Sequence, residues 1–192
     1  QIVPFVRGCG FEAILSDSFV TTPSCSFYAK EVGCLGALVI TASHNPYNWL
    51  GLKIKSFNGC SVDESFTSEV EKRLMLGNSI EKIDGVNQLV DITKFHVDRI
   101  QPRFNIDYLS KRLKKMKLRI FVDSMHGSAA NCMAEIFASN DLEVISEIRK
   151  DADPFFGGNP PEPLLNYADN LKQTLMKNST NEVKTLGIIF DG

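Results

Sequence analysis

The chain has 192 residues, of which 43% are hydrophobic and 23% are charged, and its formal net charge is −2. This length fits one large or two small domains, and the composition is that of an ordinary globular protein rather than a disordered or fibrous one. The near-zero charge argues against a nucleic acid or a membrane surface as partner, and no apolar run approaches the roughly 20 residues needed to span a bilayer.

The first half of the chain alternates strand and helix signals. Pro23 favours the start of a helix, because proline fits the first helical turn. The apolar run at 35–41 is continuous, which is typical of a strand covered on both faces of its sheet. The predicted elements are a strand at 11–15, a helix at 22–31, a strand at 35–41, its antiparallel partner at 52–55 and a helix at 63–76. The loop-rich stretch 77–102 is the best candidate for a domain boundary.

The second half repeats the order of strand and helix more regularly. Its predicted elements are a helix at 108–116, a strand at 118–123, a helix at 128–138, a strand at 142–148, a helix at 163–177 and a strand at 186–190. Such an order predicts a parallel sheet with right-handed crossovers. We therefore predict an α/β protein of two tandem three-layer domains with mixed or mostly parallel sheets, at residues 1–102 and 103–192.

Two further features concern the whole chain. It opens without a methionine and closes directly after a strand signal, so we expect a fragment of a longer protein. The cysteines are odd in number and form no C-x-x-C pair, which favours reduced thiols in the cytoplasm over disulfides or a zinc site. They are Cys9, Cys25, Cys34, Cys60 and Cys132.

Polar residues follow three of the predicted strands. In open α/β sheets, ligands bind outside the carboxyl ends of the strands, although an aspartate there can equally cap a helix. The residues at these strand ends are Ser43 and His44, then Asp123 with His126 and Gly127, and finally Asp191. Together they predict a ligand site without specifying a reaction.

Ser43 has the most informative surroundings. Pro46 keeps Asn45 out of the α region, so the loop runs extended and the Ser43 hydroxyl points away from the sheet, with His44 beside it and Lys53 ten residues on. A serine needs a base or an electrophilic partner to act as a nucleophile. Alternatively, Ser43 and Asn45 merely satisfy backbone groups in a turn. The residues alone leave both interpretations open.

Other charged or titratable positions carry weaker signals. His126 could bind an anion at a helix N-terminus, but a structural role in a loop is the better interpretation. His96 belongs to no motif. The basic run at 111–119 is interrupted by apolar residues and has no interleaved aromatics, so it predicts a solvated helix face rather than a nucleic-acid surface.

Several motifs together resemble one enzyme family. T-A-S-H-N-P at 41–46 resembles the phosphoserine loop of the α-D-phosphohexomutases, the family of phosphoglucomutase and phosphomannomutase. The supporting motifs are T-P at 22–23, G-x-K at 51–53, Gly59, D-P-F-F-G-G-N-P-P-E-P at 153–163, and G-I-I-F-D-G at 187–192, which is similar to the opening of the metal loop D-G-D-x-D-R. One departure is Leu50, where many members have asparagine before the glycine of N-G-x-K.

The resemblance implies part of domain 1 and nearly all of domain 2 of a four-domain enzyme. It implies that Ser43 is a phosphoserine that gives its phosphoryl group to a hexose 1- or 6-phosphate of glucose or mannose. The two phosphates would interconvert through a bisphosphorylated intermediate. Lys53 would act in acid–base chemistry, with His44 beside the phosphate. Asp191 and the phosphate on Ser43 would bind Mg²⁺, and glucose 1,6-bisphosphate or mannose 1,6-bisphosphate would phosphorylate the serine. The expected partners are a phosphosugar and the missing C-terminal domains.

Three alternatives remain beside this expectation. Phosphoglucosamine mutase is the nearest, because sugar choice depends mainly on the third and fourth domains. A haloacid-dehalogenase-type phosphatase would use Asp191 as its nucleophile, but that motif usually lies near the chain start and continues D-x-D. A phosphosugar-binding relative without turnover is the third. The sequence leaves the oligomeric state open, and we expect the chain by itself to be inactive.

Overall fold

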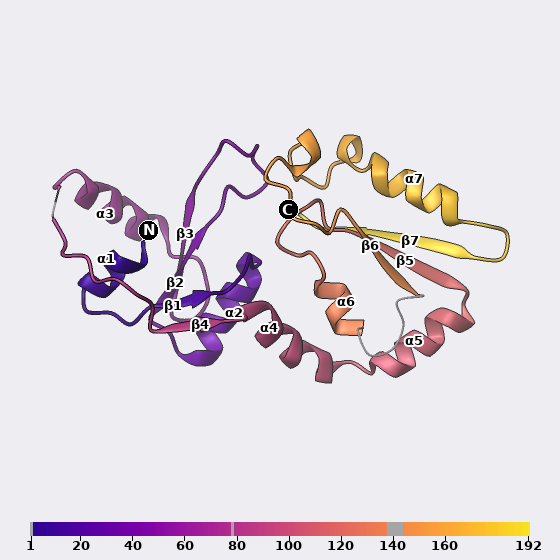
Figure 1. Cartoon of the computed structure of the whole chain (residues 1–192), viewed down its shortest axis with the longest axis horizontal. Coiled ribbons are helices and arrows are strands. Elements are labelled where there is room, and N and C mark those ends of the chain that lie inside the picture. The colour runs from indigo at the N-terminus through magenta and orange to yellow at the C-terminus, as the bar shows by residue number, and fades with distance from the viewer. Residues whose placement is uncertain (1, 78, 138–143) are drawn as a thin grey trace. The chain divides into compact units, whose positions relative to one another are not determined.

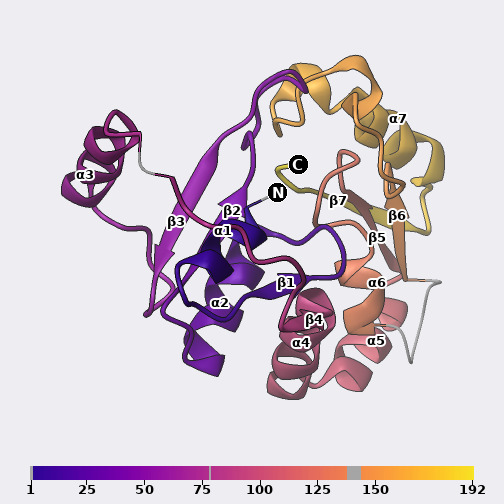
Figure 2. The same cartoon turned by 60° about the vertical axis from the view of Figure 1, so that its left-hand side comes forward.

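The computed structural model describes residues 2–77, 79–137 and 144–192, and its backbone divides into two compact units (Figures 1 and 2). Unit 1 comprises residues 1–39 and 53–92, and unit 2 comprises residues 40–52 and 93–192. The loop that holds Ser43 therefore clusters with the second half of the chain.

The secondary structure alternates along the whole chain. Up to residue 90 the elements are α1 (Val3–Gly8), β1 (Ile14–Ser16), α2 (Thr22–Val32), β2 (Gly36–Ile40), β3 (Leu52–Ser56), α3 (Glu64–Leu74) and β4 (Gln88–Val90). From residue 92 they are α4 (Ile92–Ile100), α5 (Ile106–Lys115), β5 (Leu118–Asp123), α6 (Cys132–Phe137), β6 (Ile145–Ile148), α7 (Asp169–Asn178) and β7 (Lys184–Ile189). In the described residues, 3₁₀ turns lie at Gln101–Arg103, Phe156–Gly158 and Leu165–Tyr167.

In unit 1, local signals set the helix ends. The Thr21 hydroxyl caps α2 by accepting a hydrogen bond from the Ser24 amide at 3.2 Å, and the helix ends at Gly33 in the left-handed conformation (φ 78°). The Asp63 carboxylate caps α3 in the same way at the Phe66 amide, at 2.9 Å. Both helices begin within one residue of their predicted starts.

The strands of unit 1 form two small sheets. β1 pairs in parallel with β4, with Leu15 opposite Leu89, and β2 pairs with β3. The prediction that the strand at 35–41 is covered on both faces is wrong: Val39 is buried, whereas Leu38 and Ile40 are 46% and 52% exposed. Burial alternates because the described residues pack against one face only.

In unit 2, a parallel sheet of strand order β6-β5-β7 lies between helices, with α5 and α6 on one face and α7 on the other (Figure 1). The main core forms on the α5–α6 face and contains Ile106, Ile120, Val122, Phe137, Val144 and Ile145. On the opposite face, Gly187 lets α7 approach β7, because a Cβ there would come within 3.0 Å of the Leu171 and Leu175 side chains. This is a three-layer α/β/α arrangement, as predicted.

Several predicted boundaries need correction. The loop-rich stretch 77–102 contains β4 and the whole of α4. β4 is only three residues long and depends on pairing with the distant β1. The helix predicted at 163–177 begins only at Asp169, after the 3₁₀ turn at 165–167. The helix predicted at 128–138 begins at Cys132. Residues 138 and 142–143 of the predicted elements lie outside the described residues.

No helix in the described ranges has the length and apolar character needed to cross a membrane. All five cysteines are free thiols.

Candidate functional site

The loop from Thr41 to Gly51 joins β2 to β3 and holds Ser43 in an uncommon conformation. The Thr41 amide donates to the Gly51 carbonyl at 3.0 Å, which closes the loop at its base. The Ser43 amide donates to the Thr41 hydroxyl at 2.9 Å, and Ser43 adopts φ 57°. Non-glycine residues seldom adopt positive φ, and such strained positions concentrate at functional sites.

Asn45 fixes the other side of this turn. Its backbone amide and its side-chain amide both donate to the Ala42 carbonyl, at 3.1 and 2.8 Å. The Ser43 hydroxyl, in contrast, makes no hydrogen bond to any residue that the structure describes. The turn is therefore held by Thr41 and Asn45, and the half-buried Ser43 hydroxyl remains available for chemistry.

The other two predicted catalytic residues are exposed. His44 lies beside Ser43 at the turn, and Lys53 is the second residue of β3, two positions beyond the loop closure at Gly51. Within the described ranges neither side chain has an ion pair or a hydrogen bond. Ser43 and His44 thus lie on the loop, in unit 2, and Lys53 lies on β3, in unit 1.

Within unit 2, the loop contacts the segment at 153–163 that the sequence also singled out. The rings of Tyr47 and Phe155 meet edge to face with their centroids 4.8 Å apart. The Asp153 carboxylate orders this segment by accepting from the amides of Phe155 and Gly157, both at 2.9 Å. These hydrogen bonds, with a smaller effect of His126, hold the pKa of Asp153 below its usual value.

Asp191 lies at the end of β7, and its backbone is fixed on both sides. The Phe190 amide donates to the Asp123 carbonyl at 2.9 Å, and the Gly192 amide donates to the Pro161 carbonyl at 3.0 Å. The backbones at Gly127 and Gly192 are so close that a Cβ on Gly127 could not be accommodated. The Asp191 side chain itself is exposed.

Asp123, the third strand-end candidate, is a buried partner of Arg149 instead of an exposed ligand. Its carboxylate is fully buried and accepts from Nε of Arg149 at 2.7 Å, from Nη2 of Arg149 at 2.6 Å and from the Met125 amide at 3.1 Å. A bidentate arginine–carboxylate pair is a strong, geometrically specific contact. Arg149 was not predicted as a partner of Asp123. The one signal for it in the sequence is a cation directly after the strand at 145–148.

The remaining histidines have structural surroundings. His126 adopts φ 60°, donates its amide to the Arg149 carbonyl at 2.7 Å and places Nδ1 2.8 Å from the Asp151 carbonyl, in agreement with the structural interpretation. His96 lies on α4, where burial lowers its pKa. Among the described residues, no group of three or more His, Cys, Asp or Glu side chains could hold a metal ion.

Two family models cover most of the chain. Residues 2–79 match the description "Phosphoglucomutase/phosphomannomutase, alpha/beta/alpha domain I", and residues 94–192 match domain II of the same family.

Individual relatives agree with these matches. A phosphoglucomutase from Staphylococcus haemolyticus is 24% identical over 98% of this chain, and a protein described as a probable phosphoglucosamine mutase from Methanobrevibacter smithii is 26% identical over 93%. The crystal structure of the phosphoglucomutase pp63/parafusin from Paramecium shares the fold, with a TM-score of 0.78 at 22% identity over 100% of this chain.

The chain spans only part of each of these proteins: 37% of the Staphylococcus enzyme, 38% of the Methanobrevibacter protein and 41% of the Paramecium chain. The α/β/α domains that these family models describe agree with the fold of this chain. The chain therefore belongs to the phosphoglucomutase/phosphomannomutase family and comprises its domains I and II.

Proposed function

We propose that the protein is a phosphohexomutase that interconverts hexose 1-phosphates and hexose 6-phosphates of glucose, mannose or both. The observation that carries this proposal is the Ser43 turn. A serine with φ 57° is held by Thr41 and Asn45 while its own hydroxyl makes no hydrogen bond to a described residue. Strained backbone positions concentrate at functional sites, and a serine hydroxyl without a partner at such a position supports a chemical role.

In this proposal Ser43 is the phosphoryl carrier. A free hydroxyl of the sugar phosphate attacks the phosphorus, the bond between phosphorus and the Ser43 Oγ breaks, and the proton of that hydroxyl finally replaces the phosphoryl group on the serine. The resulting bisphosphate then returns its other phosphoryl group to Ser43. Because such a transfer needs positioning and charge stabilisation more than covalent help, a rigid turn is the appropriate scaffold.

Lys53 and His44 would support the transfer. An ammonium at Lys53 can give a proton to the departing serine oxygen and stabilise the charge on the phosphoryl oxygens. His44, next to Ser43 and exposed, can donate a hydrogen bond to the phosphate. Both side chains are free of competing partners among the described residues, which supports these roles.

The chain also offers oxygen ligands for Mg²⁺, which is bound in proteins by one or two carboxylates together with phosphate oxygens and water. Asp191 and a phosphate on Ser43 fit this donor set. When bound, Mg²⁺ would neutralise phosphate charge during the transfer. We further propose glucose 1,6-bisphosphate or mannose 1,6-bisphosphate as the activator that phosphorylates Ser43, and a cytoplasmic location.

Phosphoglucosamine mutase is the second candidate, since a protein described as such matches the chain about as well as a phosphoglucomutase does. A binding protein without turnover is a weaker candidate because Ser43 and Lys53 are both present. The phosphatase alternative does not agree with the family to which the chain belongs.

The test is an assay of the gene product as its source organism makes it. Glucose 1-phosphate, mannose 1-phosphate and glucosamine 1-phosphate are supplied separately with Mg²⁺ and a trace of the matching bisphosphate, and the 6-phosphate formed is measured. We expect turnover of a glucose or mannose phosphate, its loss in Ser43→Ala, and label from the bisphosphate on Ser43 by peptide mass spectrometry. Turnover retained by Ser43→Ala would refute the proposal. The 192-residue chain alone is expected to be inactive.

A further inference from the structure

Helix α7 has one apolar side and one polar side. Its apolar side packs on the sheet, where Leu171 and Leu175 contact Gly187. Residues spaced by three and four positions share one face of a helix. The polar side of α7 consists of four such residues: Asn170, Gln173, Thr174 and Lys177.

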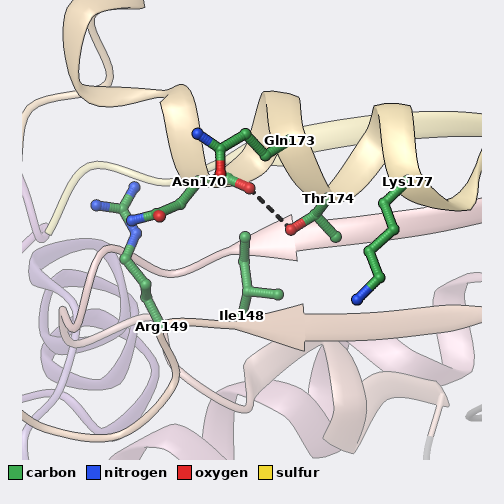
Figure 3. Close-up of a pocket in the computed structure, with 6 residues that line it drawn as sticks. All are labelled: Ile148, Arg149, Asn170, Gln173, Thr174 and Lys177. Carbon is green, nitrogen blue, oxygen red and sulfur yellow. Dashed lines mark hydrogen bonds between the residues drawn. The ribbon is translucent and has the colours of Figure 1, made fainter.

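This polar side overhangs the end of β6 and forms a pocket of about 390 Å³ with Ile148 and Arg149 (Figure 3). In the described sheet, β6 is an edge strand, because the strand order is β6-β5-β7. Figure 3 shows Arg149 beside Asn170 at one end of the pocket and Lys177 at the other. None of Ser43, His44, Lys53 and Asp191 lines it.

Arg149 is the fixed part of this pocket. Its side chain is only 10% exposed, and Asp123 holds its Nε and Nη2 in a bidentate pair. Nη2 also donates to the Tyr167 carbonyl at 3.2 Å, so that nitrogen is fully used. Nη1 makes no hydrogen bond to any described residue. A buried guanidinium with a fixed orientation therefore keeps two N–H groups for a ligand.

The pocket has an excess of hydrogen-bond donors and positive charge. Asp123 balances Arg149, but among the described residues nothing pairs with the Lys177 ammonium. The side-chain amides of Asn170 and Gln173 likewise make no hydrogen bond within the described part of the chain. None of the six lining residues is acidic. The pocket therefore favours an anionic ligand that also carries neutral hydrogen-bonding groups.

We propose that this pocket binds a small phosphate monoester at a site separate from the Ser43 loop. The phosphate pairs with Lys177 and accepts from the Gln173 amide, while hydroxyl oxygens of the same molecule accept from Nη1 of Arg149 and bond to Asn170. Charge-assisted contacts to phosphate are the strongest hydrogen bonds available to such a ligand. The Asp123 carbonyl also accepts from the Phe190 amide, so the pocket is connected through Arg149 and Asp123 to the turn at Asp191.

The test is a titration of the 192-residue chain with glycerol 3-phosphate at constant ionic strength, followed through amide chemical shifts. We expect saturable shifts at Ile148, Arg149 and Lys177. Lys177→Gln should raise the Kd by roughly 1.5- to fivefold, the range for an ion pair that solvent reaches. Lys172→Gln removes the same charge from the same helix outside the pocket and should leave the Kd unchanged.

Three results would overturn the proposal. If Lys172→Gln weakens binding as much as Lys177→Gln, or if sulfate binds with the same Kd and the same shifts, the pocket holds an adventitious ion only. If the shifts are absent from Ile148 and Arg149, or confined to the loop at 41–51, there is no second site. Ser43→Ala should leave this Kd unchanged, so failure here and failure of the proposed mutase activity are separate results.

Discussion

Replacing Arg149 with methionine should strongly destabilise unit 2. The substitution keeps much of the side-chain volume but removes both hydrogen bonds to the Asp123 carboxylate, at 2.7 and 2.6 Å, and leaves that fully buried group with the Met125 amide as its one hydrogen-bond donor among the described residues. Removing one partner of a buried ion pair costs about 3–5 kcal/mol. For a protein of this size, that cost corresponds to a fall in Tm of about 10 °C.

Two controls separate burial from simple loss of charge. Arg73→Met removes an arginine from an exposed ion pair with Glu69, whose side chains are 73% and 52% exposed, and should cost about 0.5 kcal/mol or less. The double variant Asp123→Leu with Arg149→Met removes both buried charges and should recover most of the loss, because an apolar pair of similar volume is often tolerated.

The measurement is urea unfolding followed by circular dichroism, analysed as a double-mutant cycle. The two units can unfold in separate transitions, so the transition that shifts must be assigned to unit 2 by the loss of its amide signals. A loss below about 1 kcal/mol for Arg149→Met, or a double variant no more stable than the single one, would show that the pair does not stabilise unit 2 as we infer.

Three further predictions use other parts of the chain. Phe155→Ala should loosen the Ser43 loop by removing the edge contact to Tyr47, and the emission of Trp49, the single tryptophan, should change; Phe104→Ala, which removes an equally exposed ring (57%), should leave it unchanged. Hydrogen bonds from the Ser65 hydroxyl and the Phe66 amide lower the pKa of Asp63. The carboxylate should therefore stabilise α3 fully above the usual carboxyl pKa of about 4, and this stabilisation should be lost as the pH falls through the lowered pKa. In Asp63→Asn, amide exchange in α3 should lose this acid dependence. Burial, helped by Glu135 and Glu147, raises the pKa of Cys132 to about 11, so iodoacetamide at neutral pH should modify the exposed Cys9 and Cys60 well before it, as peptide mapping would show; equal rates would contradict the burial of Cys132.

Much of the fold was predictable because its signals are local. The strand at 118–123 was predicted at its observed limits, since a run of apolar residues between two turns is readable without knowing its neighbours. The helix α2 was predicted from the proline in its first turn, and α3 from the helical spacing of Phe66, Val70 and Leu74. The sequence also identified the Ser43 loop, because the end of the apolar run at Thr41 and the Asn45-Pro46 step lie close together on either side of the serine.

What the sequence could not show depends on contacts between distant residues. β4 is a strand only because β1 lies beside it, and three residues carry no periodicity of their own. Asp123 looked like a possible ligand until the structure paired it with Arg149, 26 positions later. The sequence by itself therefore determined the α/β class, the family motifs and the serine. Only the tertiary structure decided which polar residues are consumed in buried pairs and which remain free, because desolvation and pairing are properties of the packed chain.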